Sequence, residues 1–272
     1  MRQPAVAGHF YPAEPAQLRE EVGRLLGRAD PQAGGRAAPP ALALLVPHAG
    51  YLYSGRVAGA TYASAALPGS LVILCPNHTG RGRPMAICSR GGWLTPLGPA
   101  AIHERLADLV LSHCEEVEVD DAAHRGEHSL EVQIPFLQVS LGTFSFVPLC
   151  VGTEDLAALL RLGAGLGRAL KEAREPVGLI LSSDMSHYVT AQQARAKDMM
   201  AIERILALDP EGLHRVVRQH DITMCGYAPA VAGLAAANAA GASHARLVAY
   251  ASSGDASGDY ERVVGYAGVT IS

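Results

Sequence analysis

Three histidines stand just after strongly apolar segments of the sequence. His48 follows "LLVP", His78 follows "LCPN", and His187 closes the stretch "LSSDMSH" after the apolar run "VGLIL". In open α/β sheets, ligands collect at the carboxyl ends of the strands, so side chains that follow different strands meet there. One such histidine would more often cap its strand, but three of them in the same kind of position predict a shared site.

Two further segments offer groups that could complete this site. Glu127 and His128 stand in "GEHSLEVQ" before a helical segment that Ser129 could cap, and the spacing alone slightly favours a capping segment with solvent-facing charges. Cys225 stands in "TMCGYAPA", just before another helical segment. The dipole of that helix is expected to lower the pKa of the thiol, which makes it a better ligand or nucleophile.

These residue types allow two kinds of chemistry. Two histidines and a cysteine suit a transition metal, and three protein ligands leave coordination positions open for a substrate. His187 would then act as an acid or base near neutral pH, with Asp184 or Tyr188 to orient it. The alternative is a hydrolase in which Cys225 is the nucleophile beside His187 or His128.

The rest of the chain predicts the elements that would position these residues. Apolar strand-like segments alternate with amphipathic helical segments, which is typical of a sheet covered by helices on both faces. Strands are predicted at residues 41–50, 70–80, 84–89, 143–152, 176–184, 245–255 and 261–271. Helices are predicted at residues 16–30, 54–67 with Ser54 as the N-cap, 98–113, 129–141 with a kink or break at Pro135, 154–175, 191–208, 210–220 and 226–241. A Gly- and Pro-rich loop is predicted at residues 31–40.

This pattern favours a single α/β domain over residues 1–272. No Ser/Gly linker, charge block or internal repeat divides the chain. The alternative is a pair of subdomains divided near residue 150.

Composition excludes several classes of function. The net charge is −4 and no cluster of Lys and Arg is present, so we expect no nucleic-acid partner. The apolar runs are far shorter than the roughly 20 residues of a membrane-spanning helix. Five cysteines without CxxC spacing, and an N-terminal segment without an apolar signal region, predict a cytoplasmic protein.

Seven segments together resemble the Memo family, whose prokaryotic members are labelled AmmeMemoRadiSam system protein B. They are "RQPAVAGHFYP", "VPHAGYLYSG", "PNHTG", "WLTPLG", "HRGEHSLEVQIPFLQ", "SSDMSHY" and "MCGYAP", in this order from residue 2 to about residue 230. The family is similar in fold to the class III extradiol (LigB-type) dioxygenases. The resemblance therefore implies a single α/β domain with a central mixed sheet flanked by helices.

The resemblance also implies a metal-ligand set. In Memo proteins two histidines and a cysteine form the metal pocket, and by motif these are His48, His78 and Cys225. The implied cofactor is a divalent transition metal, with Fe(II) foremost and copper or zinc as alternatives. Cys225 stands where the dioxygenases have a carboxylate, which argues against ring cleavage of the usual kind.

Four further residues receive roles from the resemblance. His187 matches the acid/base histidine of the dioxygenases, His128 matches a second pocket histidine, and Asp184 and Tyr53 would line the same cleft. Together these roles imply an enzyme with redox or oxygen-related chemistry on an unknown small substrate. The radical-SAM and Amme-type proteins of the same system are the partners that the resemblance implies.

The resemblance leaves a non-catalytic alternative. The eukaryotic branch of the family is associated with signalling, so the pocket of this chain would serve to bind a peptide or a partner protein. This alternative predicts an exposed groove around Tyr51, Tyr53 and Trp93.

Overall fold

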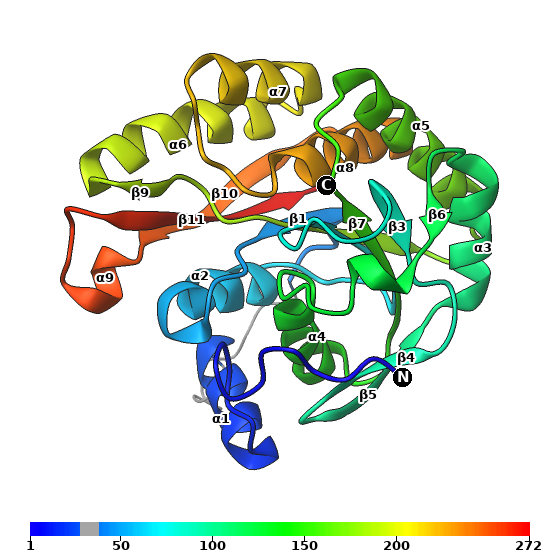
Figure 1. The fold of residues 1–272 in the computed structure, drawn as a ribbon, viewed down its shortest axis with the longest axis horizontal. Helices are drawn as coiled ribbons and strands as arrows, with labels where there is room; N and C mark the ends of the chain where they lie inside the picture. The colour runs from blue at the N-terminus through cyan, green and yellow to red at the C-terminus, as the bar shows by residue number, and fades with distance from the viewer. Residues whose placement is uncertain (28–37) are drawn as a thin grey trace.

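Helices cover both faces of one mixed sheet in the computed structural model, which describes residues 1–27 and 38–272 (Figure 1). The loop predicted at 31–40 and the end of the helix predicted at 16–30 therefore lie largely outside the described residues. The strands are β1 (Ala43–Val46), β2 (Ser70–Pro76), β3 (Met85–Ile87), β4 (Gly92–Thr95), β5 (Gly98–Ile102), β6 (Glu118–Val119), β7 (Ser145–Val151), β8 (Val177–Ser182), β9 (His187–Val189), β10 (Ala245–Ser252) and β11 (Val263–Ile271).

The helices fill most of the connections between these strands. They are α1 (Pro15–Leu25), α2 (Tyr51–Ala63), α3 (Glu104–His113), the short 3₁₀ turns η1 (Asp121–Ala123) and η2 (Glu131–Gln133), α4 (Ile134–Leu141), α5 (Leu156–Glu172), α6 (Ala191–Leu206), α7 (Pro210–Gln219), α8 (Tyr227–Ala240) and α9 (Gly254–Ser257). Over residues 1–27 and 38–272, none of them combines the length and apolar character that a membrane crossing requires.

The four central strands of the sheet are parallel, and an antiparallel pair flanks them on each side. The strand order is β10-β11-β1-β8-β2-β7-β3-β6, and the neighbours β1, β8, β2 and β7 run parallel. β11 pairs with β1 in the antiparallel direction, and so does β3 with β7. β8 comes from the second half of the chain and lies between β1 and β2 from the first half, so a division near residue 150 would cut through the sheet.

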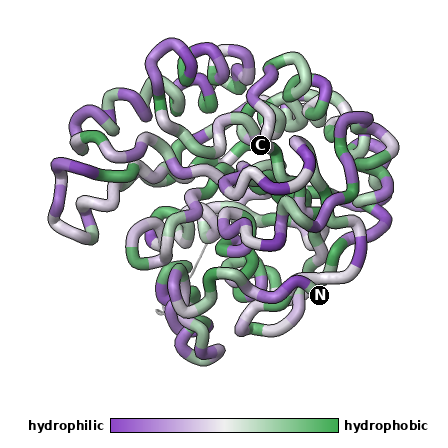
Figure 2. Tube along the Cα trace, viewed as in Figure 1, coloured by the Kyte–Doolittle hydropathy of each residue, from purple (hydrophilic) through white to green (hydrophobic). Residues whose placement is uncertain are grey.

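Both faces of the central strands are buried because their side chains alternate between two hydrophobic clusters. Leu45 and Leu181 contribute to the cluster under α3, α5, α6, α7 and α8, whereas Leu44 and Ile180 contribute to the cluster under α1, α2 and α4. Figure 2 shows hydrophobic residues gathered toward the sheet and hydrophilic residues on the outer turns of α6 and α7. A strand that is buried on both faces has a continuous apolar sequence, which is why the central strands were predicted from the sequence.

Two of the predicted elements differ from the structure, and the break predicted in a third is confirmed. α2 begins at Tyr51, three residues earlier than predicted, and Ser54 is not its N-cap but donates a hydrogen bond to the carbonyl of Ala49 at 2.8 Å. Residues 98–102 form strand β5 instead of the first turn of a helix, since they pair with β4 across a turn in which Gly98 has a φ of 111°. The break predicted near Pro135 is present, because η2 ends at Gln133 and Pro135 lies in the first turn of α4.

Close packing of α5 on α8 depends on Gly163. A Cβ atom at this position would lie 2.4 Å from the Cβ of Ala235 and 2.7 Å from the carbonyl oxygen of Ala232, so the two helices would have to separate. We expect Gly163→Ala to lower the free energy of unfolding by about 1–3 kcal/mol, measured by denaturant titration.

A matched control for this substitution is Gly23→Ala in α1. A Cβ atom at Gly23 meets nothing within 4 Å, so alanine should raise the free energy of unfolding by about 0.5–1 kcal/mol. Changes of the same sign in the two variants would contradict this account of the α5–α8 contact.

Candidate metal centre

The carboxyl ends of three adjacent parallel strands meet at one edge of the sheet. β1 leads to His48, β2 leads to His78, and β8, which lies between them, leads through residues 183–186 to His187. The strand order thus confirms that these three histidines follow strands whose carboxyl ends are neighbours. How their side chains are placed depends on the loops after the strands.

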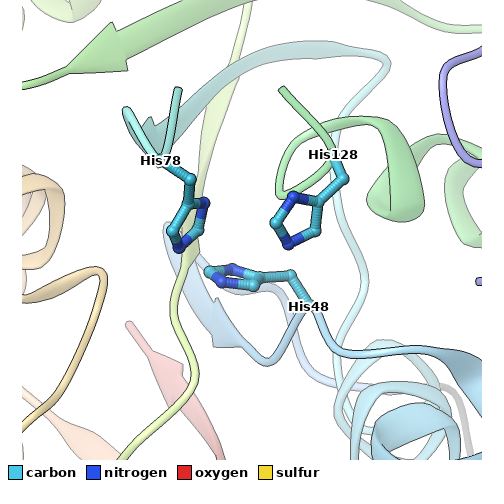
Figure 3. Close-up of side chains that lie close together, drawn as sticks. All are labelled: His48, His78 and His128. Carbon is cyan, nitrogen blue, oxygen red and sulfur yellow. The ribbon is translucent and has the colours of Figure 1, made fainter. Parts of the chain in front are cut away.

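The imidazoles that converge are those of His48, His78 and His128 (Figure 3). One ring nitrogen from each lies within 4.8 Å of the others, a separation that allows them to hold one metal ion. The ring centroids are 5.3 Å apart for His48 and His78, 5.6 Å for His48 and His128, and 4.8 Å for His78 and His128. His128 reaches this point from the loop before η2 and takes the place at the centre that spacing alone would have given to His187.

Hydrogen bonds behind His48 fix which of its ring nitrogens carries a proton. The Ser182 hydroxyl donates to the carbonyl of Ser129 at 2.6 Å, and it accepts from the Gln133 amide at 2.9 Å. The only proton of this hydroxyl is therefore in the hydrogen bond to Ser129. His48 Nδ1, at 2.9 Å, must then be the donor to Ser182 Oγ. His48 Nε2 is left with a free lone pair, the form that a metal ligand needs.

Glu127 orients the imidazole of His78, because its carboxylate accepts a hydrogen bond from the ring. Its carboxylate is fully buried and accepts from the backbone N–H of His78 at 2.6 Å, from His78 Nδ1 at 2.9 Å, and from the N–H and hydroxyl of Ser129 at 3.0 and 2.7 Å. Burial alone would raise the pKa of Glu127, but these hydrogen bonds outweigh it and hold the pKa at about 2. The prediction of a solvent-facing side chain, which the spacing slightly favoured, is therefore wrong for Glu127.

The three imidazoles differ in how they respond to this environment. Burial, and then the neighbouring imidazoles, lower the pKa of His48 well below its usual value, and burial lowers the pKa of His128. Burial also acts to lower the pKa of His78, but the Glu127 carboxylate outweighs it and raises that pKa. His128 Nδ1 lies 3.5 Å from Glu127 Oε1, and its ring packs against Phe10 with centroids 4.8 Å apart.

Cys225 lies against the free lone pair of His48. Its Sγ is 3.2 Å from His48 Nε2 and 3.7 Å from the carbonyl oxygen of Asp184, just before α8 begins. The expected lowering of the thiol pKa by the helix dipole is wrong, because burial and then the Asp184 carboxylate raise the pKa of Cys225. A bound cation would reverse this, since it favours the thiolate.

Asp184 holds the loop after β1. Its carboxylate is buried and accepts from the backbone N–H of His48 at 2.7 Å and of Ala49 at 3.3 Å. Burial raises the pKa of Asp184 to about 6 in spite of these hydrogen bonds. Asp184 therefore positions the backbone of His48.

The residue that orients His187 is Thr223, not the expected Asp184 or Tyr188. His187 donates its backbone N–H to Thr223 Oγ1 at 2.7 Å, and its Nδ1 is 2.9 Å from the carbonyl oxygen of Thr223. Because a carbonyl only accepts, His187 Nδ1 donates this hydrogen bond. Tyr188 points to solvent with 66% of its surface exposed.

The exposed aromatic groove expected for a peptide-binding module is absent at the residues predicted for it. Tyr51 and Trp93 are only 4% and 1% exposed, and the Tyr51 hydroxyl donates to the carbonyl of Val132 at 2.7 Å. Tyr53 is 42% exposed on α2, and its hydroxyl makes no hydrogen bond within residues 1–27 and 38–272. An exposed aromatic groove through Tyr51 and Trp93 is therefore excluded.

The spacing of one donor pair, His48 Nε2 and Cys225 Sγ, is compatible with coordination of one metal ion. A nitrogen ligand at about 2.1 Å and a sulfur ligand at about 2.3 Å from a tetrahedral ion lie about 3.6 Å apart. The distance of 3.2 Å between His48 Nε2 and Cys225 Sγ is close to this value. Buried hydrogen-bond partners behind His48 and His78 complete the kind of support that metal-ligating histidines have.

Fold and site together define an α/β protein with a cluster of three histidines at the carboxyl edge of its sheet. Residues 2–270 match the family model of the Memo-like proteins, and the chain belongs to this family. The family that the seven sequence segments indicated is thereby confirmed.

Curated relatives cover almost the whole chain. A MEMO1 family protein of Methanopyrus kandleri is 41% identical over 278 residues, which cover 99% of this chain and 98% of the relative. A MEMO1 family protein of Aquifex aeolicus is 41% identical over 270 residues, with coverage of 99% and 98%.

A solved structure with a similar fold is that of an uncharacterized protein from Escherichia coli K12. Its TM-score is 0.57 at 14% sequence identity, and the match covers 85% of this chain and 99% of that protein. This likeness concerns the fold alone, and it agrees with the predicted single α/β domain with a mixed central sheet.

Proposed function

We propose that His48, His78 and Cys225 bind one divalent transition-metal cation and that the whole chain, residues 1–272, forms one domain around this centre. The observation that supports the proposal best is the fixed tautomer of His48, which turns an unprotonated Nε2 toward Cys225 Sγ at 3.2 Å. Hydrogen bonding to Ser182 and Glu127 prepares both imidazoles for a cation before it arrives. Fe(II) is the proposed metal, with copper and zinc as alternatives.

The proposed reaction is a redox or oxygen-related conversion of a small organic substrate, for which a bound Fe(II) or copper ion would supply the electron-transfer chemistry. His187 would accept or return a proton at Nε2, since its Nδ1 proton is held by Thr223. His128 would serve the same purpose, while Asp184 keeps the His48 loop in place and Tyr53 would lie beside the same site. The proposed setting is the cytoplasm, with the radical-SAM and Amme-type proteins of the same system as partners.

The ligand assignment predicts the metal content of variants. His48→Ala and Cys225→Ala should each reduce the metal affinity by about 100-fold or more, because loss of a ligand exceeds the 10- to 100-fold effect of losing a supporting residue. The measurement is elemental analysis of protein purified without added metal or chelating resin, followed by titration with Fe(II), Cu(I) and Zn(II).

Matched controls are His244→Ala and Cys114→Ala, which remove the same chemical groups elsewhere in the protein. His244 lies just before β10, and Cys114 is buried behind the C-terminus of α3. Unchanged metal content in both His48→Ala and Cys225→Ala would sink the proposal.

The convergence of three imidazoles favours a second candidate, in which His128 replaces Cys225 as the third ligand. Cobalt(II)-substituted protein separates the two, because thiolate coordination gives a sulfur-to-metal charge-transfer band that imidazole ligands do not give. We expect this band in the wild-type protein and in His128→Ala, and its loss in Cys225→Ala. A wild-type spectrum without the band would assign the centre to the three histidines.

A further inference from the structure

A β-bulge lies directly beside His187. The short strand β9 pairs with β11 in the antiparallel direction, and the register of the pair shifts at Tyr188, which has no partner on β11. The φ of Tyr188 is 60°, so its backbone is in the left-handed region. Bulges of this kind change the direction of the neighbouring side chains and are frequent next to active sites. The direction of the His187 side chain therefore depends on this bulge.

The backbone of Tyr188 is strained, because a bulky side chain disfavours a positive φ. Within residues 1–27 and 38–272, the other non-glycine residues with a positive φ are Leu208 and Asp221. These two follow the C-termini of α6 and α7, where left-handed residues are common. Tyr188 lies within a strand instead, and its side chain is 66% exposed, so burial of its own ring does little to hold the segment. Other contacts must keep the bulge in place.

Asp198 of α6 makes such a contact on the N-terminal side of the bulge. Its side chain is fully buried, and its carboxylate accepts from the backbone N–H of Ser186 at 2.9 Å and from the hydroxyl of Tyr250 on β10 at 2.7 Å. Figure 1 shows α6 beside β9, β10 and β11. The carboxylate thus ties the residue directly before His187 to a helix and to a strand that are distant in the sequence.

Gly265 of β11 holds the same residue from the other side. Its N–H donates to the carbonyl of Ser186 at 2.9 Å, and its own carbonyl accepts from the N–H of Met185 at 2.8 Å. A Cβ atom at position 265 would collide with the Asp198 carboxylate, so the absence of a side chain lets α6 and β11 meet at this point. Both backbone groups of Ser186 are therefore fixed.

We propose that Asp198 is a positioning residue for His187: by fixing Ser186 it holds the strained bulge at Tyr188 and, with it, the His187 imidazole. Thr223 accepts the backbone N–H of His187 at 2.7 Å and lies 2.9 Å from its Nδ1 through the carbonyl oxygen, so the imidazole is held from two separate elements. Groups that transfer protons need such support from their neighbours. This inference rests on the proposed role of His187 in proton transfer.

Amide hydrogen exchange of the full-length, metal-free protein at neutral pH, followed by NMR, tests the proposal. Asp198→Ala should speed the exchange of the Ser186 and His187 amides by about tenfold or more, and Asp198→Asn, which keeps an acceptor but loses the charge, by about threefold. The ring ¹⁵N shifts of His187 should show that Nδ1 no longer donates steadily to Thr223 in Asp198→Ala. The measurement needs neither metal nor substrate, so its outcome is independent of the proposed metal centre.

Two further variants separate positioning from a general loss of stability. Ile205→Ala removes a buried side chain from the same helix and should leave the exchange of Ser186 and the ring shifts of His187 unchanged. Tyr188→Asn, added to Asp198→Ala, should slow the exchange again by about threefold or more, because asparagine adopts the left-handed conformation more readily. The proposal is wrong if folded Asp198→Asn or Asp198→Ala exchanges like the wild type. It is also wrong if Ile205→Ala has the same effect, or if Tyr188→Asn restores nothing.

Discussion

Replacement of Glu127 by glutamine is expected to lower the metal affinity of the protein by about 10- to 100-fold. Four donors point at the buried carboxylate of Glu127: the backbone N–H and Nδ1–H of His78, and the N–H and hydroxyl of Ser129. A glutamine side chain brings one acceptor and two donors of its own, so some of these groups lose their partner. His78 is then no longer held with Nδ1 protonated and Nε2 free, and it must reorganise before it binds a cation.

Competition with a chelator of known affinity measures this effect, with circular dichroism and thermal unfolding of the metal-free variant as a check on its fold. Glu118→Gln is the matched control, because Glu118 lies on the short edge strand β6 with an exposed side chain that pairs with Arg83 at 3.3 Å. Glu127→Gln protein that is folded and binds metal as tightly as Glu118→Gln would contradict the role given to Glu127.

The fold was largely predictable because its central strands obey a simple physical rule. β1, β2, β7 and β8 are buried on both faces and are therefore continuous apolar runs, which a sequence displays directly. β4 and β5 were missed because they are short and form a hairpin at the sheet's margin, where alternate residues of β5 are exposed. Residues 98–102 were consequently assigned to the helix that follows them.

The sequence predicted which residues of the candidate site follow the strands, but not the side chains that support them. The order of β1, β8 and β2 brings His48, His187 and His78, which follow these strands, to one edge of the sheet. The side chains that hydrogen-bond to them come from distant segments. Thr223 is 36 residues from His187, and Gln133 is 49 residues from Ser182. No local spacing shows such partners, and the same limit explains why the buried Glu127 was taken for a surface charge.

Replacement of Glu131 by alanine is expected to lower the free energy of unfolding by about 3–5 kcal/mol. Glu131 is fully buried and pairs with Arg2 at 2.6 Å, and it also accepts from the Tyr11 hydroxyl at 2.6 Å. The backbone N–H groups of Ala5 and Val6 complete its partners at 2.8 and 3.0 Å. Alanine would leave the guanidinium of Arg2 without its counter-charge and three other donors without an acceptor, which costs more than the ion pair itself contributes.

Denaturant titration measures this loss, and a double-mutant cycle identifies its cause. Arg2→Met combined with Glu131→Leu leaves no unpaired charge, so the double variant should be more stable than the sum of the two single changes implies. Glu21→Ala, which removes an exposed ion pair with Arg24 on α1, should change stability by about 1 kcal/mol or less. Because Glu131 holds residues 5–11 and Phe10 packs on His128, the same variant should also loosen the contact between Phe10 and His128. Strictly additive losses in the cycle would show instead that the hydrogen bonds to Glu131, and not the buried charge of Arg2, dominate the stability of this segment.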